Sequence, residues 1–141
     1  MPESRLWIAG AYADPQGDST PVNSPVTGEK LADLPRASTE QLDAAVAAAQ
    51  RAWDDYRHWS VYERADLCHR IAGLIEEHHE DLARLTTIEQ GKPYKAEALA
   101  DVEDAASLFS ISAEDAKRLY GEVIPSSARN KRMFTYRAPV G

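Results

Sequence analysis

The first 35 residues carry short apolar runs separated by turn formers. The run from Leu6 to Tyr12 is rich in strand-forming residues, and the DPQGD sequence at 14–18 that follows favours a turn. A second strand or hairpin is predicted up to residue 35, with Thr27 and Gly28 supplying its turn. Its three prolines remove ladder donors and allow only edge strands: Pro21, Pro25 and Pro35. Residues 1–35 are therefore predicted to be β edge segments.

From residue 38 the period of the apolar positions changes from two residues, as in a strand, to 3.6 residues, as in a helix. Ser38 followed by Gln41 forms a capping box, which predicts a first helix over 38–58. Ser60 followed by Glu63 forms a second, which predicts a helix over 60–91 that stops at Gly91. The apolar stripe of the first is Leu42, Ala45, Val46, Ala49, Trp53 and Tyr56, and that of the second is Leu67, Ile71, Leu74, Ile75, His78, Leu82 and Leu85.

A third helix is predicted from Pro93 to Gly121, since proline is tolerated in a first turn. Its apolar positions alternate three and four apart: Leu99, Val102, Ala106, Phe109, Ala113, Ala116 and Tyr120. Residues 122–141 are predicted to be a basic loop followed by one strand from Met133, with no partner strand in view. Residues 38–121 are thus expected to hold three helices.

The composition limits the class of protein. Leu, Ile, Val and Phe together make about 18% of the 141 residues, below the roughly 20% at which a charged composition starts to resemble a disordered chain. Alanine accounts for 23 residues, so the helices are expected to bury small-residue faces against another body. We expect the isolated chain to be partly molten or self-associating, because its large aliphatic residues are few and its last strand is unpaired.

The charge is unevenly distributed. The formal net charge is −7, but from Ser126 onward there are four basic residues and no acidic one. The first 125 residues therefore carry −11. An acidic chain is a poor ligand for nucleic acids or anionic membranes, and basic residues on edge strands often serve to prevent aggregation. We expect no nucleic-acid or membrane partner and, with neither a signal-peptide run nor an apolar span, a cytoplasmic protein.

The residues alone offer no catalytic constellation. Cys68 is the only thiol, and its neighbour His69 diverges from it by about 100° on a helix, so a half-buried thiol without catalytic role is expected. His78 and His79 lie in an acidic run, but adjacent histidines face different ways, so no metal site is expected; a zinc-binding helical hairpin there is a rival hypothesis. No glycine pattern matches a phosphate-binding loop, so no cofactor-binding residue is predicted in this chain.

Five segments nevertheless resemble, in order and spacing, the N-terminal part of the NAD(P)-dependent aldehyde dehydrogenase superfamily. They are VNSPVTGE at 22–29, STEQLDAAV at 38–46, ERA at 63–65, EQGKP at 89–93 and YGEVIP at 120–125. The sequence SAEDAKRLYGE at 112–122, followed by Lys131–Arg132 and the final PVG, is most similar to the succinate-semialdehyde dehydrogenase branch.

The resemblance implies a fold. The chain is expected to be an α-rich α/β fragment of the Rossmann-like aldehyde dehydrogenase fold, with three long helices between an N-terminal β-hairpin and one C-terminal oligomerisation-type strand. Residues 1–141 would form the N-terminal part of one domain. In the family, the main cofactor site, the nucleophilic cysteine and its general-base glutamate come later, and none of them matches a residue of this chain.

The resemblance also implies a function. The complete protein would oxidise an aldehyde, with a semialdehyde such as succinic semialdehyde as the favoured substrate, to a carboxylic acid. NAD or NADP would be the hydride acceptor, and the protein would form a homo-oligomer. The 141-residue chain alone is expected to be inactive, with the remainder of the fold as its partner. The alternative is a stand-alone helical scaffold or interaction domain derived from that family.

One row of residues is a candidate for substrate contact. In the family the third helix borders the aldehyde entry tunnel, and Ala100, Asp104 and Leu108 form an i, i+4, i+8 row outside the core stripe. This row is predicted to line the tunnel, with a solvated helix face as the competing interpretation.

Overall fold

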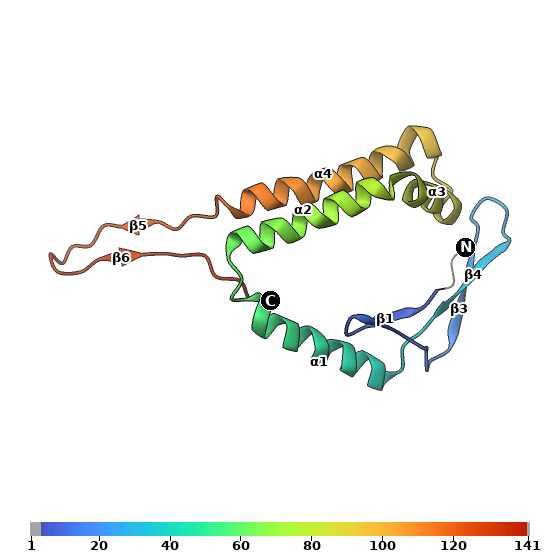
Figure 1. The fold of residues 1–141 in the computed structure, drawn as a ribbon, viewed down its shortest axis with the longest axis horizontal. Helices are drawn as coiled ribbons and strands as arrows, with labels where there is room; N and C mark the ends of the chain where they lie inside the picture. Colours follow the sequence, from blue (N-terminus) through green and yellow to red (C-terminus); the bar gives the residue numbers. More distant parts are fainter. Residues whose placement is uncertain (1–3, 141) are drawn as a thin grey trace.

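The computed structural model describes residues 4–140 (Figure 1). Four α-helices carry the architecture, and short two-stranded hairpins lie before and after them. The elements are β1 (Leu6–Ile8), β2 (Ala11–Ala13), β3 (Ser19–Asn23), β4 (Lys30–Pro35), α1 (Thr39–Tyr56), α2 (Val61–Glu77), α3 (His79–Gln90), the π-helical turn η1 (Tyr94–Ala98), α4 (Leu99–Ala116), β5 (Val123–Ile124) and β6 (Met133–Phe134).

The N-terminal segment forms two separate antiparallel hairpins. In the first, β1 pairs with β2 across a turn at Ala9 and Gly10, both at positive φ, so the expected run from Leu6 to Tyr12 bends in its middle. The rings of Trp7 and Tyr12 pack edge to face with centroids 4.8 Å apart. In the second, β3 pairs with β4 around the predicted turn, where Gly28 has φ +74°. Each described sheet has two strands, so every strand is an edge, as the prolines predict.

Both predicted capping boxes are present. The Ser38 hydroxyl accepts from the Gln41 amide at 3.2 Å, and the Gln41 side chain accepts from the Ser38 amide at 3.1 Å. The Gln41 side chain also donates to the carbonyl of Asp14, which fastens the start of α1 to the preceding turn. Ser60 and Glu63 form the second box at the start of α2.

The predicted helix over 60–91 is two helices. His78 leaves the helical conformation at φ −102° and ψ 16°, so α2 ends there and α3 begins. The break allows α3 to pack Ala83 against Ala98 and Val102 at the start of the next helix. Four helices therefore replace the three that the sequence predicts. Gly91 ends α3 in the left-handed conformation, as expected.

The third predicted helix begins with a wider turn. The amide of Ala98 donates to the carbonyl of Pro93 at 3.0 Å, which is the i to i−5 pattern of a π turn. The α-helical part, α4, ends at Ala116, five residues before the predicted stop at Gly121. Figure 1 shows α4 running back alongside α2 in the opposite direction.

Small side chains form the interior. The buried hydrophobic residues among those described are alanines and one valine: Ala65, Ala72, Ala83, Ala98, Val102, Ala106 and Ala113. Alanine lets two helix backbones approach closely, so these residues form a seam where α2, α3 and α4 meet. We call them the alanine seam.

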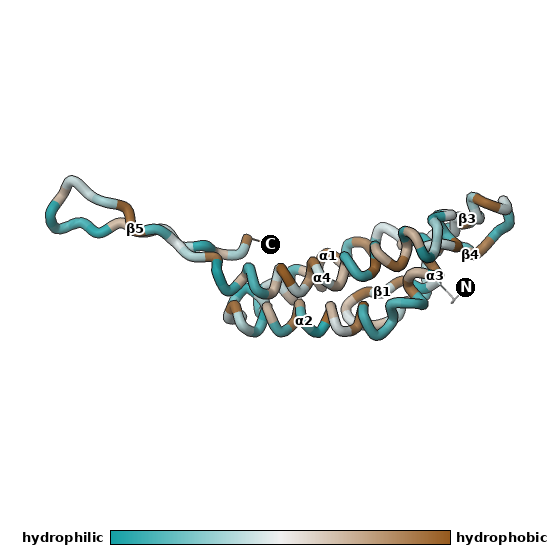
Figure 2. The backbone as a smooth tube through the Cα atoms, turned by 90° about the horizontal axis from the view of Figure 1, so that it is seen from above, coloured by the Kyte–Doolittle hydropathy of each residue, from teal (hydrophilic) through white to brown (hydrophobic). Residues whose placement is uncertain are grey.

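The predicted stripes differ in how far they enter this seam: that of α4 supplies Val102, Ala106 and Ala113, whereas larger residues of α1 and α2 lie outside it. Leu42 and Val46 on α1 are 58% and 62% exposed, and Leu74 on α2 is 56% exposed. Figure 2 shows hydrophobic positions spread along the helices and the C-terminal hairpin instead of gathered at one centre. The stripe of α4 is therefore confirmed as a buried face, whereas the exposed members of the α1 and α2 stripes mark outward faces.

The C-terminal segment is a two-stranded arm, not one unpaired strand. β5 pairs with β6, with Val123 opposite Phe134 and Ile124 opposite Met133. At its base the amide of Thr135 donates to the carbonyl of Glu122 at 2.9 Å. Figure 1 shows the arm, residues 120–138, projecting away from the helices. No helix among residues 4–140 is both long enough and apolar enough to cross a membrane.

Candidate functional site

The predicted tunnel row lies on the outer side of α4. Ala100, Asp104 and Leu108 are all exposed. Asp104 follows the buried Val102 by two residues, so at about 100° per residue it points to the opposite side of the helix. The three side chains share one face that is open to a neighbouring body. Nothing among the described residues covers them.

Cys68 is half-buried on α2, as predicted. The imidazole of its neighbour is directed elsewhere, because His69 Nε2 lies 3.1 Å from Glu114 Oε1 on α4. Glu114 also accepts from Lys117 Nζ at 2.7 Å. These hydrogen bonds, first that of Lys117 and then that of His69, lower the pKa of the Glu114 carboxyl. The polar cluster ties α2 to α4 beside the alanine seam.

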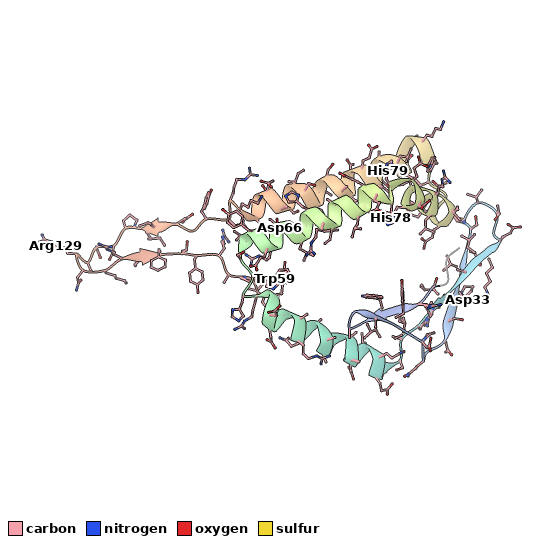
Figure 3. The ribbon with its side chains drawn as sticks, in the orientation of Figure 1. Asp33, Trp59, Asp66, His78, His79 and Arg129 are labelled. Carbon is pink, nitrogen blue, oxygen red and sulfur yellow. The ribbon has the colours of Figure 1, made fainter. Side chains whose placement is uncertain are left out.

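His78 and His79 occupy different environments (Figure 3). His78 lies at the junction of α2 and α3 and lines a groove beside β4. His79 faces the other way, with Nε2 3.6 Å from Glu103 Oε1 on α4, in a hollow between the two helices. Within residues 4–140 there is no group of three or more histidine, cysteine or acidic side chains placed to hold a metal ion. The zinc hypothesis therefore finds no third ligand in this part of the chain.

The groove beside β4 has an apolar floor. It has a volume of about 670 Å³ and lies between the second hairpin and α3. Its lining residues are Lys30, Leu31, His78, Asp81, Leu82, Arg84, Leu85 and Ile88. Both cations have acidic partners, since Lys30 pairs with Asp33 at 2.6 Å and Arg84 with Glu80 at 3.1 Å. The two cations of the groove are thus already paired, and Asp81 adds a negative charge to its lining.

Two of the sequence motifs meet in space. Gly91 of the EQGKP motif has φ +73°, and a Cβ there would lie 3.2 Å from side-chain atoms of Pro25 and Val26 of the VNSPVTGE motif. In that turn the Ser24 hydroxyl accepts from the amides of Val26 and Thr27, both at 3.2 Å. The second hairpin therefore rests on the end of α3 through a contact that only glycine accommodates without strain. Sequence reasoning identified both motifs but not their contact.

The segment after Gly91 is held by side chains that sequence reasoning also missed. Lys92 forms an ion pair with Asp101 across the π turn, and this hydrogen bond is the main cause of a raised pKa of the Lys92 ammonium. Arg84 of α3 is hydrogen-bonded to Tyr94, which raises the pKa of its guanidinium. These contacts fix the angle at which α3 meets α4. In the sequence these contacts are marked only by two basic residues, Arg84 and Lys92, that precede a helix with an acidic first turn. That pattern is too common to predict a specific contact.

The described residues do not fit a dinucleotide site. The sheets are antiparallel pairs, and the described glycines lie in hairpin turns, in the link between β2 and β3, inside α2, at the end of α3 or in the arm. None of them follows a parallel strand and opens a helix, which is the arrangement that cradles a pyrophosphate. No chemical step is assigned to residues 4–140.

Comparison with known proteins supplies the wider context. The aldehyde dehydrogenase family matches residues 12–141. The chain is 40% identical over 136 residues to a 3-sulfolactaldehyde dehydrogenase of Pseudomonas putida, covering 96% of this chain and 27% of that protein. It is 38% identical over 135 residues to an NADP⁺-dependent succinate-semialdehyde dehydrogenase of Escherichia coli, covering 95% of this chain and 28% of that protein.

Solved structures agree with these relatives. A crystal structure of an NADP-dependent enzyme from Escherichia coli superimposes with a TM-score of 0.87 at 38% identity, covering 94% of this chain and 27% of the other. The chain thus spans about a quarter of the length of the proteins it matches. The fold of the helices and hairpins is that of the corresponding part of these enzymes. The chain belongs to the aldehyde dehydrogenase family.

Proposed function

We propose that the complete protein carrying this chain is an NAD(P)-dependent dehydrogenase that oxidises an aldehyde with an acidic group at its other end, such as succinic semialdehyde, to the carboxylic acid. The observation that carries the proposal is the 38–40% identity, along at least 95% of the chain, to dehydrogenases named for 3-sulfolactaldehyde and succinic semialdehyde. Both named substrates are short aldehydes with an anionic end. The choice between NAD and NADP stays open, although the Escherichia coli relative is named for NADP⁺.

Within that enzyme, residues 1–141 are proposed to be the N-terminal part of one domain and to act as scaffold. The support is the exposure of large apolar side chains on α1, α2 and α4, while the alanine seam fills the interior. Burying apolar surface contributes about 25 cal/mol per Å², so these faces favour contact with the remainder of the fold. The arm is proposed to take part in a homo-oligomer. Cytoplasmic location is part of the same proposal.

The chain alone is proposed to be inactive. Its one thiol is half-buried. The imidazoles of His69, His78 and His79 face carboxylates or a groove instead of that thiol, and that of His58 accepts a hydrogen bond from Arg57. The test compares the 141-residue protein with a complete dehydrogenase that carries it, using succinic semialdehyde with NAD⁺ and with NADP⁺. Reduced cofactor should form only with the complete protein. Turnover by the purified short chain would overturn the scaffold assignment.

The tunnel assignment of Ala100, Asp104 and Leu108 is a separate proposal. It is supported by their common exposed face on α4. In the complete enzyme, Asp104→Leu should change the ratio of kcat/KM values between an anionic and a neutral aldehyde of similar length. An exposed carboxylate near the path of an anionic substrate repels it, so the anionic aldehyde should gain. An unchanged ratio would show that the row is only a solvated face.

The alternative function is a stand-alone interaction domain. The exposed apolar faces and the projecting arm favour it, because both are surfaces for partners. The two functions differ in the size of the natural polypeptide. Immunodetection in the source cell with an antibody against residues 61–116 should reveal one band about four times longer than this chain. A band of about 16 kDa alone would favour the interaction domain.

A further inference from the structure

His79 has a buried ring nitrogen that lacks a hydrogen-bond partner. It is the first residue of α3, directly after the break at His78 (Figure 3). Its side chain is 27% exposed, yet Nε2 is buried and makes no hydrogen bond with a described residue. Oε1 of Glu103 on α4 lies 3.6 Å from this nitrogen, which is too far for a hydrogen bond. A buried polar atom left unpaired costs free energy in the folded protein.

The hollow around this nitrogen is acidic. It lies between the end of α2 and α4, has a volume of about 280 Å³, and is lined by Glu76, His79, Val102, Glu103, Ala106 and Ser107. Neither Glu76 nor Glu103 pairs with a lysine or an arginine among residues 4–140. Of the described residues that line the hollow, only His79 can become a cation. A proton on its imidazole would therefore meet two unpaired carboxylates.

The other charged groups of the surrounding elements have partners or lie outside the hollow. The paired groups are Glu80 with Arg84, Lys92 with Asp101, and Arg84 with Tyr94. Those outside the hollow are Glu77 at the end of α2, Lys95 and Glu97 on η1, and Asp81 and His78 beside the groove on the other side of α3. The positive N-terminal end of α3 opposes a cation at its first residue, but two acidic residues in its first turn offset this effect.

Histidine ordinarily changes its charge between pH 5 and 8, whereas carboxylates stay ionised over most of that range. A neutral imidazole carries a proton on one ring nitrogen, and the imidazolium carries one on both. We propose that His79 is a pH-sensitive latch between the junction of α2 and α3 and the neighbouring helix α4. When the imidazole takes up a proton from solvent, Nε2–H donates to Glu103 and closes the hollow. When it loses that proton, the contact is released. The latch goes beyond the proposed dehydrogenase function and does not depend on it.

The latch acts on the contact that holds α3 in place. Val102 lines the hollow and also packs with Ala83 and Ala98 in the alanine seam. Closing the hollow therefore holds the start of α3 against α4, and opening it weakens that contact. The stabilising effect exists only while His79 carries its proton, so it is present at low pH and lost as the pH rises.

The second pair of a histidine and a glutamate between α2 and α4 lacks this property. His69 Nε2 lies 3.1 Å from Glu114 Oε1, so the neutral imidazole already has a hydrogen-bond partner there. Lys117 donates to the same oxygen of Glu114 at 2.7 Å, so that carboxylate already has a cation. Protonation of His69 therefore creates no new contact, whereas protonation of His79 does.

Hydrogen exchange of the complete protein that carries this chain tests the latch, at about pH 5.5 and about pH 8. EDTA in both buffers removes metal ions that could bridge the same side chains. The protection of the parent is divided by that of His79→Gln at the same pH, because the chemical pH dependence of exchange cancels in this ratio. For peptides covering 79–90 and 99–108, the ratio should be roughly three- to fivefold higher at the lower pH. The same ratio at both pH values would overturn the latch.

Replacement of the carboxylates identifies the partner. Glu103→Gln should abolish the pH-dependent change in the ratio, and adding His79→Gln to it should change nothing further. Glu103 is 69% exposed, so this variant keeps the test valid even if position 79 does not tolerate glutamine. Full retention of the pH effect in Glu103→Gln, or its loss only in Glu76→Gln, would overturn the assigned contact.

His58→Gln is the matched control. It also removes one imidazole, but His58 accepts a hydrogen bond from its neighbour Arg57 and lies outside the contact between α2 and α4. Protection of peptides 79–90 and 99–108 relative to the parent should then be the same at both pH values. A pH effect as large as that of His79→Gln would mean that the loss of any imidazole is sufficient, and it would overturn the latch.

Discussion

Replacing Gly91 by alanine should loosen the contact between the second hairpin and α3. Gly91 has φ +73°, which costs a residue with a Cβ about 1–2 kcal/mol. The new Cβ would also lie 3.2 Å from Pro25 Cγ and 3.2 Å from Val26 Cγ2, so the hairpin must shift by a few tenths of an ångström. Crowding of this kind adds roughly 1 kcal/mol. The expected loss in the free energy of unfolding is roughly 2–3 kcal/mol.

Urea unfolding followed by circular dichroism measures this loss, and hydrogen exchange of peptides 22–29 and 85–98 locates it. Gly73→Ala is the matched control, because Gly73 lies inside α2 with open space around it. That substitution should stabilise the helix by about 0.5–1 kcal/mol. The reasoning is refuted if Gly91→Ala unfolds at the same urea concentration as the parent, or if exchange increases in only one of the two peptides.

Further substitutions test other contacts. Ala9→Asn should stabilise the chain by about 0.5–1 kcal/mol in the same urea assay, because Ala9 has φ +54° and asparagine tolerates that conformation better. Gly121→Ala should separate the base of the arm, since a Cβ would lie 1.8 Å from the Thr135 carbonyl oxygen; exchange of the Thr135 amide should rise. Hydrogen bonds from the backbone and side chain of Ser60 lower the pKa of Glu63, so its stabilising effect is present above pH 4.5 and lost as the pH falls through the lowered pKa. Glu63→Gln should remove that part of the pH dependence of helix content, and an unchanged profile would contradict it.

The helix starts could be predicted from the sequence, while the break at His78 could not. Ser38 and Ser60 each precede a residue whose side chain returns the hydrogen bond, and such a pair is local and readable. His78 has neither glycine nor proline beside it, and the chain turns there so that Ala83 can reach Ala98 and Val102. A break driven by tertiary packing leaves no local signal.

The C-terminal arm shows the same limit. The strand at Met133 could be predicted, but its partner at Val123–Ile124 is two residues long and falls where the helical period had just ended. One of the two reasons for expecting a molten chain is therefore wrong, because the last strand is paired. The other reason stands, since the buried residues of the described chain are small and contribute little apolar area each. A broad thermal transition is still expected, and a sharp cooperative melt of a monomer would contradict it.

The candidate site was harder to predict than the fold because the residues that form it lie far apart in the sequence. The motifs EQGKP and VNSPVTGE were recognisable as sequences. In the structure they meet where Gly91 approaches Pro25 and Val26, and neither segment alone reveals that contact. The tunnel row on α4 rests on helical spacing alone, and spacing assigns a face without identifying what lies against it. The test on Asp104 therefore has to be made in the complete enzyme.

The alanine seam explains why the hydrophobic pattern indicated the helices correctly but their packing only in part. A large apolar stripe normally marks the face that a helix buries in its own domain. Here α4 buries Ala106 of its predicted stripe, but α2 buries Ala65 and Ala72, which lie outside its predicted stripe, while Leu74 stays exposed. Leucine stripes left on the outside are favourable only if another body covers them, which is the expectation for a chain that spans about a quarter of its relatives. Leu74→Glu should therefore be tolerated by the isolated chain but should destabilise the complete enzyme, and equal effects in both would show that the stripe is an ordinary solvent face.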